Sequence, residues 1–392
     1  MNIQEHYDVA VCGGGFGGIS AALAAARAGK KTILFEKEYI LGGLGTAGLI
    51  AIYLPLCDGY GRQVSFGIAE ELLRLSVTYG AEGKYPENWL EGKGSRTEKD
   101  KRFQVQYNPQ LFAILAERLL LEAGVHILYG TYVVGTALEG GKIKELRVHN
   151  KSGELTYSVG SVVDATGDCD IAHMSGAPTD TFKQGNILAA WYYFADREGY
   201  KMRMLGASDT PEEEKGKKAS PTLLSNRRFG GLEGKELSEM VCLSHSTALK
   251  DFLSLRQKDP SAQMATLPTI PQIRMTRKLV GEYTLSHTEA HTYFEDSIGM
   301  VSNWKERGPV YEVPFRTLFC SQVKNLLVAG RCTSVNETLW DVMRVIPCCA
   351  VTGQAAGEAA AMTDDLTSIN IKELQLRLEN SGVVLHERNI KN

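Results

Sequence analysis

The chain has 392 residues, 43% of them hydrophobic and 40 of them glycine, so it is long enough for a large core and two domains. A formal net charge of −3 argues against nucleic acid and anionic membrane surfaces as partners. We find neither a secretory signal nor an apolar run near the roughly 18 residues of a membrane span, and therefore expect a cytoplasmic protein without membrane contact.

The first elements predict a parallel α/β unit. Residues 7–12 and 31–36 have the apolar character of buried strands, and the Ala-rich residues 17–28 between them predict a helix that ends at Gly29. Two strands joined by a helix form a βαβ unit, which favours a parallel sheet.

A GxGxxG pattern joins the first strand to the first helix. Gly13 suits the tight turn, Gly15 lets backbone approach a pyrophosphate, and Gly18 lets helix and strand pack closely. The N-terminus of the helix attracts anions. Glu36 ends the second strand, where a carboxylate accepts hydrogen bonds from ribose hydroxyls and repels the 2′-phosphate of NADP. These features leave FAD and NAD as alternatives.

The middle of the chain predicts a helix, a meander and a polar excursion. Residues 109–123 predict an amphipathic helix with proline at its start. Four strands follow and predict an antiparallel meander, at 125–129, 131–138, 142–149 and 155–164. Residues 199–240 are charged and rich in glycine and proline, which predicts a mobile surface excursion, either a lid or a plain insertion.

Three later features favour FAD over NAD. A second glycine-rich loop, residues 42–46, follows the ribose acid directly. A strand ends at residues 165–168 (ATGD), and a last strand at 324–329 leads to Gly330 and Arg331. The last core helix, from Pro347 through Ala361, has a face of small residues. A single NAD domain does not need this returning strand and helix, whereas a long FAD does.

These motifs resemble the bacterial FAD-dependent oxidoreductases related to fumarate reductase, which have the glutathione-reductase-like fold. The matching elements are "GGGFGGISAALAAARAG", "EK…LGG", "DATGD", "IRMTRKLVGEYTL" and "NLLVAGRC…R…GQAAGEAAA". The resemblance implies an α/β fold with a Rossmann-like FAD-binding domain, containing a parallel sheet and an antiparallel β-meander, and a smaller inserted α+β substrate domain. The expected boundaries are 1–180 with 317–365 for FAD, 181–316 for substrate, and 366–392 for a C-terminal helical tail.

By the same resemblance, FAD contacts residues from five segments. The loop after the first strand would hold the pyrophosphate, Glu36 the adenosine ribose, and the N-terminus of the last core helix would face the flavin pyrimidine ring. The implied cofactor-binding residues are Gly13, Gly15, Phe16, Gly17, Gly18, Glu36, Lys37, Gly42, Gly43, Leu44, Thr46, Val133, Ala165, Thr166, Gly167, Gly330, Arg331, Gly353 and Gln354.

The cysteines and the absence of a second nucleotide motif limit the chemistry. None of the eight cysteines forms a CxxC, so we expect buried thiols and no metal site. The adjacent Cys348 and Cys349 would point about 100° apart on a helix, which strains a disulfide, and we reject a dithiol mechanism. With no second GxGxxG, electrons would come from or go to a bound substrate, a soluble carrier or a partner subunit.

Several residues are candidates for the substrate side. Arg274 or Arg277 could bind a substrate carboxylate or an anion near the flavin, or could form a structural ion pair with Glu282 or Asp296. Arg344 precedes the last core helix and could sense substrate or reduced flavin, with Asp341 as the alternative ion-pair partner. Tyr283 and His287 are candidate proton donors.

Two further patterns in this region leave alternatives open. Residues 286–289 (SHTE) predict a capping box that starts a helix with His287 and His291 on one face, where general acid/base work is favoured over metal binding. Residues 191–194 (WYYF) are consecutive aromatics that either floor a pocket or pack a sheet, and sheet packing is favoured.

We therefore predict an FAD-dependent oxidoreductase that transfers a hydride between flavin N5 and a small polar organic substrate. The alternatives are a flavin-dependent monooxygenase, or a flavoprotein subunit that passes electrons to a partner.

Overall fold

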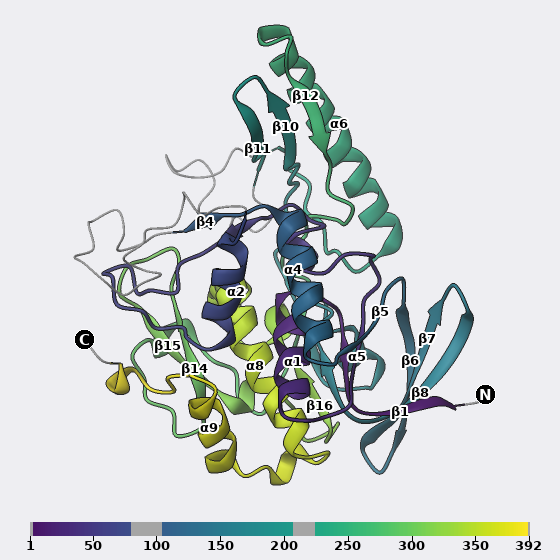
Figure 1. Cartoon of the computed structure of the whole chain (residues 1–392), viewed down its shortest axis with the longest axis vertical. Coiled ribbons are helices and arrows are strands. Elements are labelled where there is room, and N and C mark those ends of the chain that lie inside the picture. Colours follow the sequence, from purple (N-terminus) through teal and green to yellow (C-terminus); the bar gives the residue numbers. More distant parts are fainter. Residues whose placement is uncertain (1–2, 80–103, 207–223, 391–392) are drawn as a thin grey trace. The chain divides into compact units, whose positions relative to one another are not determined.

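The computed structural model describes residues 3–79, 104–206 and 224–390 (Figure 1). The chain divides into two compact units. The larger comprises Met1–Gly43, Ala51–Asp180 and Arg277–Asn392, and the smaller comprises Leu44–Ile50 and Thr181–Thr276. We predicted that residues 277–316 belong with the smaller part, whereas they pack within the larger unit. Among the described residues, no helix combines the length and the apolar character needed to cross a membrane.

A seven-stranded sheet organises the larger unit. Its order is β5-β2-β1-β8-β7-β6, with β16 also paired to β8. Strands β5, β2, β1, β8 and β16 run parallel, whereas β6, β7 and β8 form the predicted antiparallel meander. The bounds are β1 Ile3–Cys12, β2 Thr32–Phe35, β5 His126–Leu128, β6 Tyr132–Glu139, β7 Lys142–Asn150, β8 Gly153–Asp164 and β16 Leu326–Val328.

Strand β8 belongs to both parts of this sheet because it is long. Its first half pairs with β7, from Gly153 opposite Asn150 to Ser158 opposite Glu145. Its last three residues pair with β16 instead, so that Val328 lies opposite Asp164. The meander therefore extends from one end of β8, and the parallel sheet continues at the other.

Helices α1 (Phe16–Arg27) and α8 (Ile346–Met362) lie side by side (Figure 1). Their contact depends on small residues. A Cβ atom on Gly353 would lie 2.2 Å from the carbonyl oxygen of Gly17, and one on Gly357 would lie 2.2 Å from that of Ala21. The small-residue face of the last core helix therefore brings two helix backbones together, although they are more than 300 residues apart in sequence.

Helix α4 (Pro109–Glu122) forms where the sequence predicts it. The side chain of Asn108 accepts hydrogen bonds from the backbone N–H groups of Gln110 and Leu111, and Pro109 occupies the first turn. The chain leaves the helix at Gly124, whose φ of +84° is costly for residues with a Cβ. Both ends are local signals, which explains why the prediction succeeds to within one residue.

Shorter elements complete the larger unit. The helices are α2 Ile68–Val77, α5 Asp170–Met174, α7 Glu337–Met343 and α9 Ile371–Asn380. Two-stranded ladders join β3 Ile52–Tyr53 to β4 Val105–Gln106, β9 Thr179–Thr181 to β13 Arg277–Leu279, and β14 Ser297–Ser302 to β15 Val310–Pro314. Single 3₁₀ turns lie at Gly43–Gly45, His287–Glu289, Phe315–Thr317, Gly330–Cys332, Leu366–Ser368 and Glu387–Asn389.

The smaller unit packs a three-stranded antiparallel sheet against helix α6 (Gly234–Lys258). Its strands are β10 Tyr192–Asp196, β11 Gly199–Arg203 and β12 Gln263–Thr266, in the order β11-β10-β12. Tyr192 and Phe194 of β10 pack on Ala248 and Phe252 of α6, and Tyr193 stacks on Tyr200 at 4.7 Å. The consecutive aromatics thus pack a sheet, the alternative that we favoured.

The prediction of a mobile excursion over residues 199–240 is wrong at both ends. Residues 199–203 form β11, which pairs with β10 along its whole length. Helix α6 already begins at Gly234 and buries Met240, Ser244, Ala248 and Phe252 at intervals of four residues. Residues 207–223, on which a lid would depend, lie outside the described residues.

Candidate functional site

The carboxyl ends of the parallel strands form one row. Cys12 lies opposite both Phe35 and Asp164, Val328 lies opposite Asp164, and Phe35 lies opposite Leu128. The loops that follow these residues therefore leave the sheet at the same edge. In open α/β sheets, ligands bind at this edge, where the strand order reverses.

The loop after β1 brings backbone together without side chains. Gly13 has a φ of +101°, and a Cβ atom there would lie 2.5 Å from the carbonyl oxygen of Ala165. A Cβ atom on Gly18 would lie 1.8 Å from the carbonyl oxygen of Gly13. The tight turn and the close helix–strand contact that we predicted for these two glycines are both present.

Gly15 differs from the other glycines of this loop because a Cβ atom on it would meet nothing within 4 Å. It is also the N-cap of α1 and supplies no side-chain hydrogen bond to the helix. Space therefore adjoins the first-turn N–H groups, which carry a partial positive charge. A pyrophosphate fits these features. The ring of Phe16 does not face this space, because it stacks on Phe112 at 4.6 Å in the core.

Glu36 lies against this loop at the end of β2. Its Oε2 atom accepts a hydrogen bond from the N–H of Gly14 at 2.6 Å, and its Oε1 atom accepts one from the N–H of Glu38 at 2.8 Å. Burial raises its pKa, against the effect of these two hydrogen bonds. The carboxylate is thus held beside the glycine loop, as ribose binding requires. Lys37, the next residue, is exposed.

Two neighbouring segments adjoin Glu36 and the glycine loop. Gly42 forms a parallel bridge with Gly15 and donates its N–H to the carbonyl oxygen of Gly14 at 2.8 Å. A Cβ atom on Gly43 would lie 3.3 Å from the Cα atom of Gly15. Of the other predicted cofactor residues, Leu44 and Thr46 belong to the smaller unit, and Val133 lies at the start of β6, two residues after Thr131, whose N–H donates to the carbonyl oxygen of Glu36.

The loop after β8 is shaped by Asp164, which sequence reasoning did not single out. Its Oδ1 atom accepts hydrogen bonds from the N–H of Thr166 at 3.1 Å and from its hydroxyl at 2.7 Å, and Oδ2 accepts one from the N–H of Ala172 at 2.9 Å. The side chain is fully buried, which raises its pKa. These contacts hold the turn at residues 165–167. In this turn, the Cβ atom of Ala165 faces the glycine loop.

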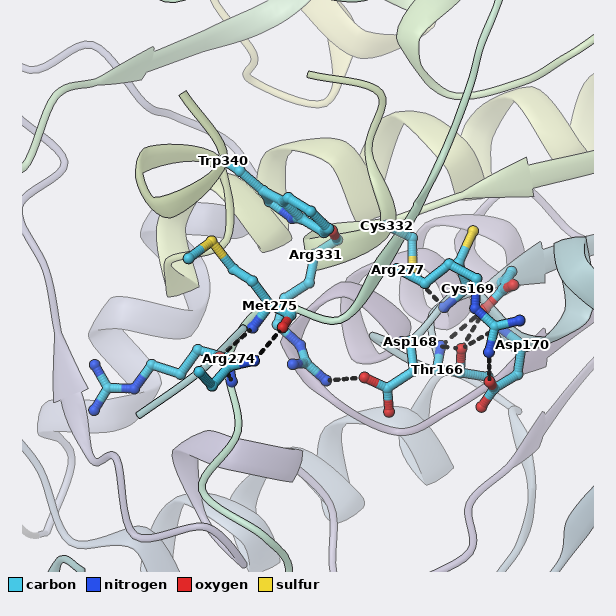
Figure 2. A network of polar contacts seen from close by, with 12 residues as sticks. Thr166, Asp168, Cys169, Asp170, Arg274, Met275, Arg277, Arg331, Cys332 and Trp340 are labelled. Atoms are coloured by element: carbon cyan, nitrogen blue, oxygen red, sulfur yellow. Dashed lines mark hydrogen bonds and ion pairs between the residues drawn. The ribbon is translucent and has the colours of Figure 1, made fainter. Parts of the chain in front are cut away.

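Two ion pairs connect this loop to later segments (Figure 2). Arg331 places Nη2 at 3.1 Å from Oδ1 of Asp168, and its guanidinium lies over Gly167, where a Cβ atom would be 2.4 Å away. Arg277 contacts Asp170 at 3.3 Å. Burial, and then the charge of Asp168, raise the pKa of Asp170 to about 6. The acidic residues of "DATGDCD" were a sequence signal from which these two ion pairs could have been predicted.

The ion-pair partners that we predicted for Arg277 are therefore wrong. Arg277 pairs with Asp170, while Asp296 pairs with Arg316 at 2.9 Å and Glu282 accepts a hydrogen bond from the N–H of Ser321. Asp341 pairs with Lys305. In each case the true partner comes from a distant segment that the fold brings close.

Arg344 lies directly before α8, as the C-cap of α7. Its Nε and Nη2 atoms are buried, and burial lowers its pKa to about 10, so it stays charged at neutral pH. The N-cap of α8, Val345, supplies no side-chain hydrogen bond, and the first turn carries no acidic residue. The positive charge of Arg344 therefore lies beside the N-terminus of α8, which itself carries a partial positive charge.

Gly353 and Gln354 have packing roles within α8. Gly353 contacts the backbone of Gly17, and the Oε1 atom of Gln354 accepts a hydrogen bond from the N–H of Ile68 at 2.8 Å. Gly330, in the turn before Arg331, donates its N–H to the hydroxyl of Thr352 at 2.9 Å. Gly330 and Gly353 thus lie close to the glycine loop, whereas the side chain of Gln354 is used to hold α2.

Arg274 belongs to the smaller unit, where it is buried against Trp191. Its guanidinium carbon lies 4.8 Å from the centre of the Trp191 ring, and only 6% of the residue is exposed. Burial lowers its pKa to about 10. A charged guanidinium held on an aromatic face is suited to bind a carboxylate.

The predicted capping box at Ser286 is present, but the helix that it should start is not. The Ser286 hydroxyl accepts a hydrogen bond from the N–H of Thr288, and Glu289 accepts one from the N–H of Ser286. The helical turn covers only His287–Glu289, and Ala290 is extended at φ −58° and ψ 139°. His291 then has a φ of +61°, so the two histidines do not share a helix face.

The candidate proton donors of this segment are separated from Arg344. The Tyr283 hydroxyl donates to Oε1 of Glu289, which raises the pKa of the phenol. The exposed His287 contacts the side chain of Asn336, and His291 contacts Glu387 at 2.8 Å. Asn336 is the N-cap of α7 and Arg344 its C-cap, so His287 and Arg344 lie at opposite ends of that helix. Among the described residues, no group of three or more His, Cys, Asp or Glu could hold a metal ion.

The cysteines are all free thiols. Cys348 donates to the carbonyl oxygen of Val342, and Cys349 to that of Arg344, both at 3.2 Å. Burial raises the pKa of Cys349 to about 12 and that of Cys348 well above its usual range. Both are therefore protonated at neutral pH, and a thiol is a poor nucleophile compared with a thiolate.

Parts of the chain are similar in sequence to curated enzymes. The aligned region of the tRNA uridine 5-carboxymethylaminomethyl modification enzyme MnmG of Lactococcus lactis subsp. cremoris (strain SK11) is 65% identical and covers 47% of this chain and 32% of that protein. The 4-oxocyclohexanecarboxylate 2-dehydrogenase of Sinomonas cyclohexanicum is 40% identical over 20% of this chain and 16% of its own length. The chain thus matches a third or less of the length of these curated relatives.

A family model matches most of the chain, and a solved structure is similar to it at low identity. A geranylgeranyl bacteriochlorophyll reductase-like protein from Thermoplasma acidophilum covers 96% of this chain and 82% of its own, with a TM-score of 0.46 and 15% identity. The model of the FAD dependent oxidoreductase family matches residues 8–190 and 190–378. The chain therefore belongs to the FAD dependent oxidoreductase family, and both the cofactor and the enzyme class that we predicted are confirmed.

Proposed function

We propose that this oxidoreductase transfers a hydride between its flavin and a small polar organic substrate. The observation that carries the proposal is the row of strand ends in the larger unit, where open space at Gly15 adjoins the N–H groups of α1 and the Glu36 carboxylate. These features fit the pyrophosphate and the adenosine ribose of FAD. When bound, FAD supplies a reversible acceptor for a hydride.

The residues of this chain then bind and orient the FAD. The N–H groups around Gly15 hold the pyrophosphate, and Glu36 accepts hydrogen bonds from the ribose hydroxyls. Arg331 and Asp168 hold each other over Gly167, which keeps the loop after β8 in place. Arg344 and the N-terminus of α8 favour negative charge, as reduced flavin carries, at the start of that helix.

A buried arginine in the smaller unit supports the proposal that the substrate is polar and carries an anionic group. Arg274 keeps its charge while stacked on Trp191, and a guanidinium in this setting binds carboxylates more strongly than an exposed lysine would. Tyr283 and His287 are proposed as proton donors. The hydrogen bond from Tyr283 to Glu289 keeps the phenol protonated at neutral pH, as a general acid requires.

Two observations favour this proposal over other substrates. The buried Cys348 and Cys349 have raised pKa values, which does not suit a dithiol that exchanges electrons with the flavin. The relative named as a tRNA modification enzyme suggests a nucleic acid, but the chain has a net charge of −3 and matches 32% of that protein. We therefore favour a small molecule over tRNA.

The test is anaerobic reduction of the FAD-loaded protein. We expect one class among small alcohols, amines and carboxylic acids to bleach the flavin spectrum, and Arg274→Ala to weaken bleaching by carboxylates but not by neutral substrates. Lys144→Ala, which removes an exposed cation on β7 of the larger unit, is the control for the loss of one positive charge. Bleaching only by NAD(P)H with substrate-stimulated oxygen uptake would instead identify a monooxygenase, and bleaching only with an added protein would identify an electron-transfer subunit.

A further inference from the structure

A hollow lies in the larger unit, beside the first part of β1. It has a volume of about 430 Å³, which is within the usual range for small-molecule sites. Its walls come from the first part of β1, from β2, β5 and β8, and from the end of α4. Tyr7 in this wall precedes Cys12 by five residues, or about 16 Å along β1. Tyr7 and its polar neighbours therefore lie away from the glycine loop, whereas Leu128 in the same wall reaches the row of strand ends.

One end of the hollow holds a chain of four polar groups. Lys31 contacts Oε1 of Glu5 at 2.5 Å, and the Tyr7 hydroxyl donates to Oε2 of Glu5 at 2.8 Å. The same hydroxyl lies 2.7 Å from Nδ1 of His126, whose ring meets the Tyr7 ring edge-on. Lys31 also lies over the Tyr7 ring, 4.8 Å from its centre. Lys31, Glu5 and Tyr7 therefore each contact at least two other members of this chain, whereas His126 contacts only Tyr7.

This chain of contacts determines which nitrogen of His126 carries the proton. The hydrogen bonds from Lys31 and Tyr7 lower the pKa of Glu5, so its carboxylate is ionised and only accepts. Tyr7 has a raised pKa, keeps its single proton and donates it to Glu5. Its oxygen must then accept from His126, which places the imidazole proton on Nδ1. In the singly protonated ring, Nε2 is then left as an acceptor, and it has no hydrogen-bond partner among the described residues.

The rest of the hollow is apolar and partly aromatic. Ile33 and Leu128 line the wall, and the Tyr157 ring lies 6.2 Å from that of Tyr7. Leu121 and Val125, at the end of α4, add further apolar surface, and 56% of Leu121 is exposed. A flat ring can pack against such walls while one polar group reaches the imidazole.

We propose that this hollow binds a small neutral phenol, whose hydroxyl donates a hydrogen bond to Nε2 of His126 and whose ring packs beside Tyr157. The site goes beyond the proposed oxidoreductase function, because it requires no flavin contact. A donor is required because Nε2 is an acceptor, and a neutral ligand is required because Glu5 already supplies a negative charge that Lys31 balances.

The experiment measures binding of p-cresol to the FAD-loaded protein by saturation-transfer NMR and calorimetry. Toluene, which lacks only the hydroxyl, is the matched ligand. We expect p-cresol to bind with one site, toluene to bind about tenfold more weakly, and His126→Ala to reduce p-cresol binding to the level of toluene. His149→Ala, an exposed histidine on β7, is the control variant and should bind p-cresol like the wild type.

A second readout tests the hydrogen-bond chain without any ligand. Two-bond proton–nitrogen correlations should show His126 as the Nδ1–H tautomer in the wild type, and Tyr7→Phe should lose this preference. Equal binding of toluene and p-cresol, unchanged p-cresol binding in His126→Ala, or an Nε2–H tautomer in the wild type would each overturn the proposal. Because His126 is exposed, its replacement should not prevent folding, which flavin content confirms.

Discussion

The two ends of strand β1 are built in opposite ways. At the carboxyl end, residues 13–18 bring backbone atoms together, and a single added Cβ atom would collide at Gly13 and Gly18. At the amino end, Tyr7 joins Glu5 and His126 through its side chain. The carboxyl end should therefore be disrupted by substitutions that add atoms, because its backbone N–H groups must stay open to an anion. The amino end should be disrupted by substitutions that remove atoms, because its surface is formed by side chains.

The largest effect should come from Gly18→Ala. Its Cβ atom would lie 1.8 Å from the carbonyl oxygen of Gly13, so α1 and the loop must separate. We expect a loss of about 3 kcal/mol in the free energy of unfolding, at the upper end of typical overpacking costs, with little flavin retained. Chemical denaturation of the apoprotein measures it. A stable Gly18→Ala protein would contradict the close contact described for this helix.

Gly15→Ala should separate folding from cofactor binding. Its Cβ atom would meet nothing within 4 Å, so the apoprotein should unfold at the same denaturant concentration as the wild type. The same atom would occupy the space beside the helix N-terminus, and we expect FAD affinity to fall by about tenfold or more, equivalent to at least about 1.4 kcal/mol. Fluorescence titration with FAD is the measurement. Unchanged affinity would show that the pyrophosphate does not approach Gly15.

Tyr7→Phe should act on stability at the other end of β1. The change removes a buried hydroxyl that makes two hydrogen bonds, and we expect a loss of about 1 kcal/mol. The aromatic contact with Tyr157 remains. A loss of flavin from this variant as severe as that in Gly18→Ala would show that the two ends of the strand are not independent.

The smallest effect concerns the acids beside the cofactor loop. Asp170 should titrate with a pKa of about 6, and Asp168→Asn should lower that value because it removes a neighbouring negative charge. Since the folded-state pKa is raised, the protonated form favours folding: this stability is fully present below about pH 4 and is lost as the pH rises through about 6. The carboxyl ¹³C shift of Asp170 measures the midpoint, which should rise in Arg277→Ala.

Local patterns predicted the elements that depend on neighbouring residues. The glycine loop, the Ala-rich helix and Glu36 follow one another within 30 residues, and Asn108, Pro109 and Gly124 mark both ends of α4. The same approach failed at residues 286–291, where the capping box is present but the chain turns extended at Ala290. There, Glu289 also binds Tyr283 and His291 also binds Glu387, and these contacts lie outside any helical pattern.

The amino-acid sequence alone predicted a dinucleotide loop and a candidate ribose-binding acid near the start of the chain, and it determined the turn, helix and carboxylate there because these need only short-range geometry. It also indicated FAD through the order of three distant motifs. Only the tertiary structure decided which charges meet, as when Arg277 pairs with Asp170 and Asp341 with Lys305. The chain from Lys31 to His126 likewise exists only because parallel pairing of β1, β2 and β5 aligns residues that the sequence separates by up to 121 positions. Sheet order and register are set by burial over the whole unit, and no local pattern contains them.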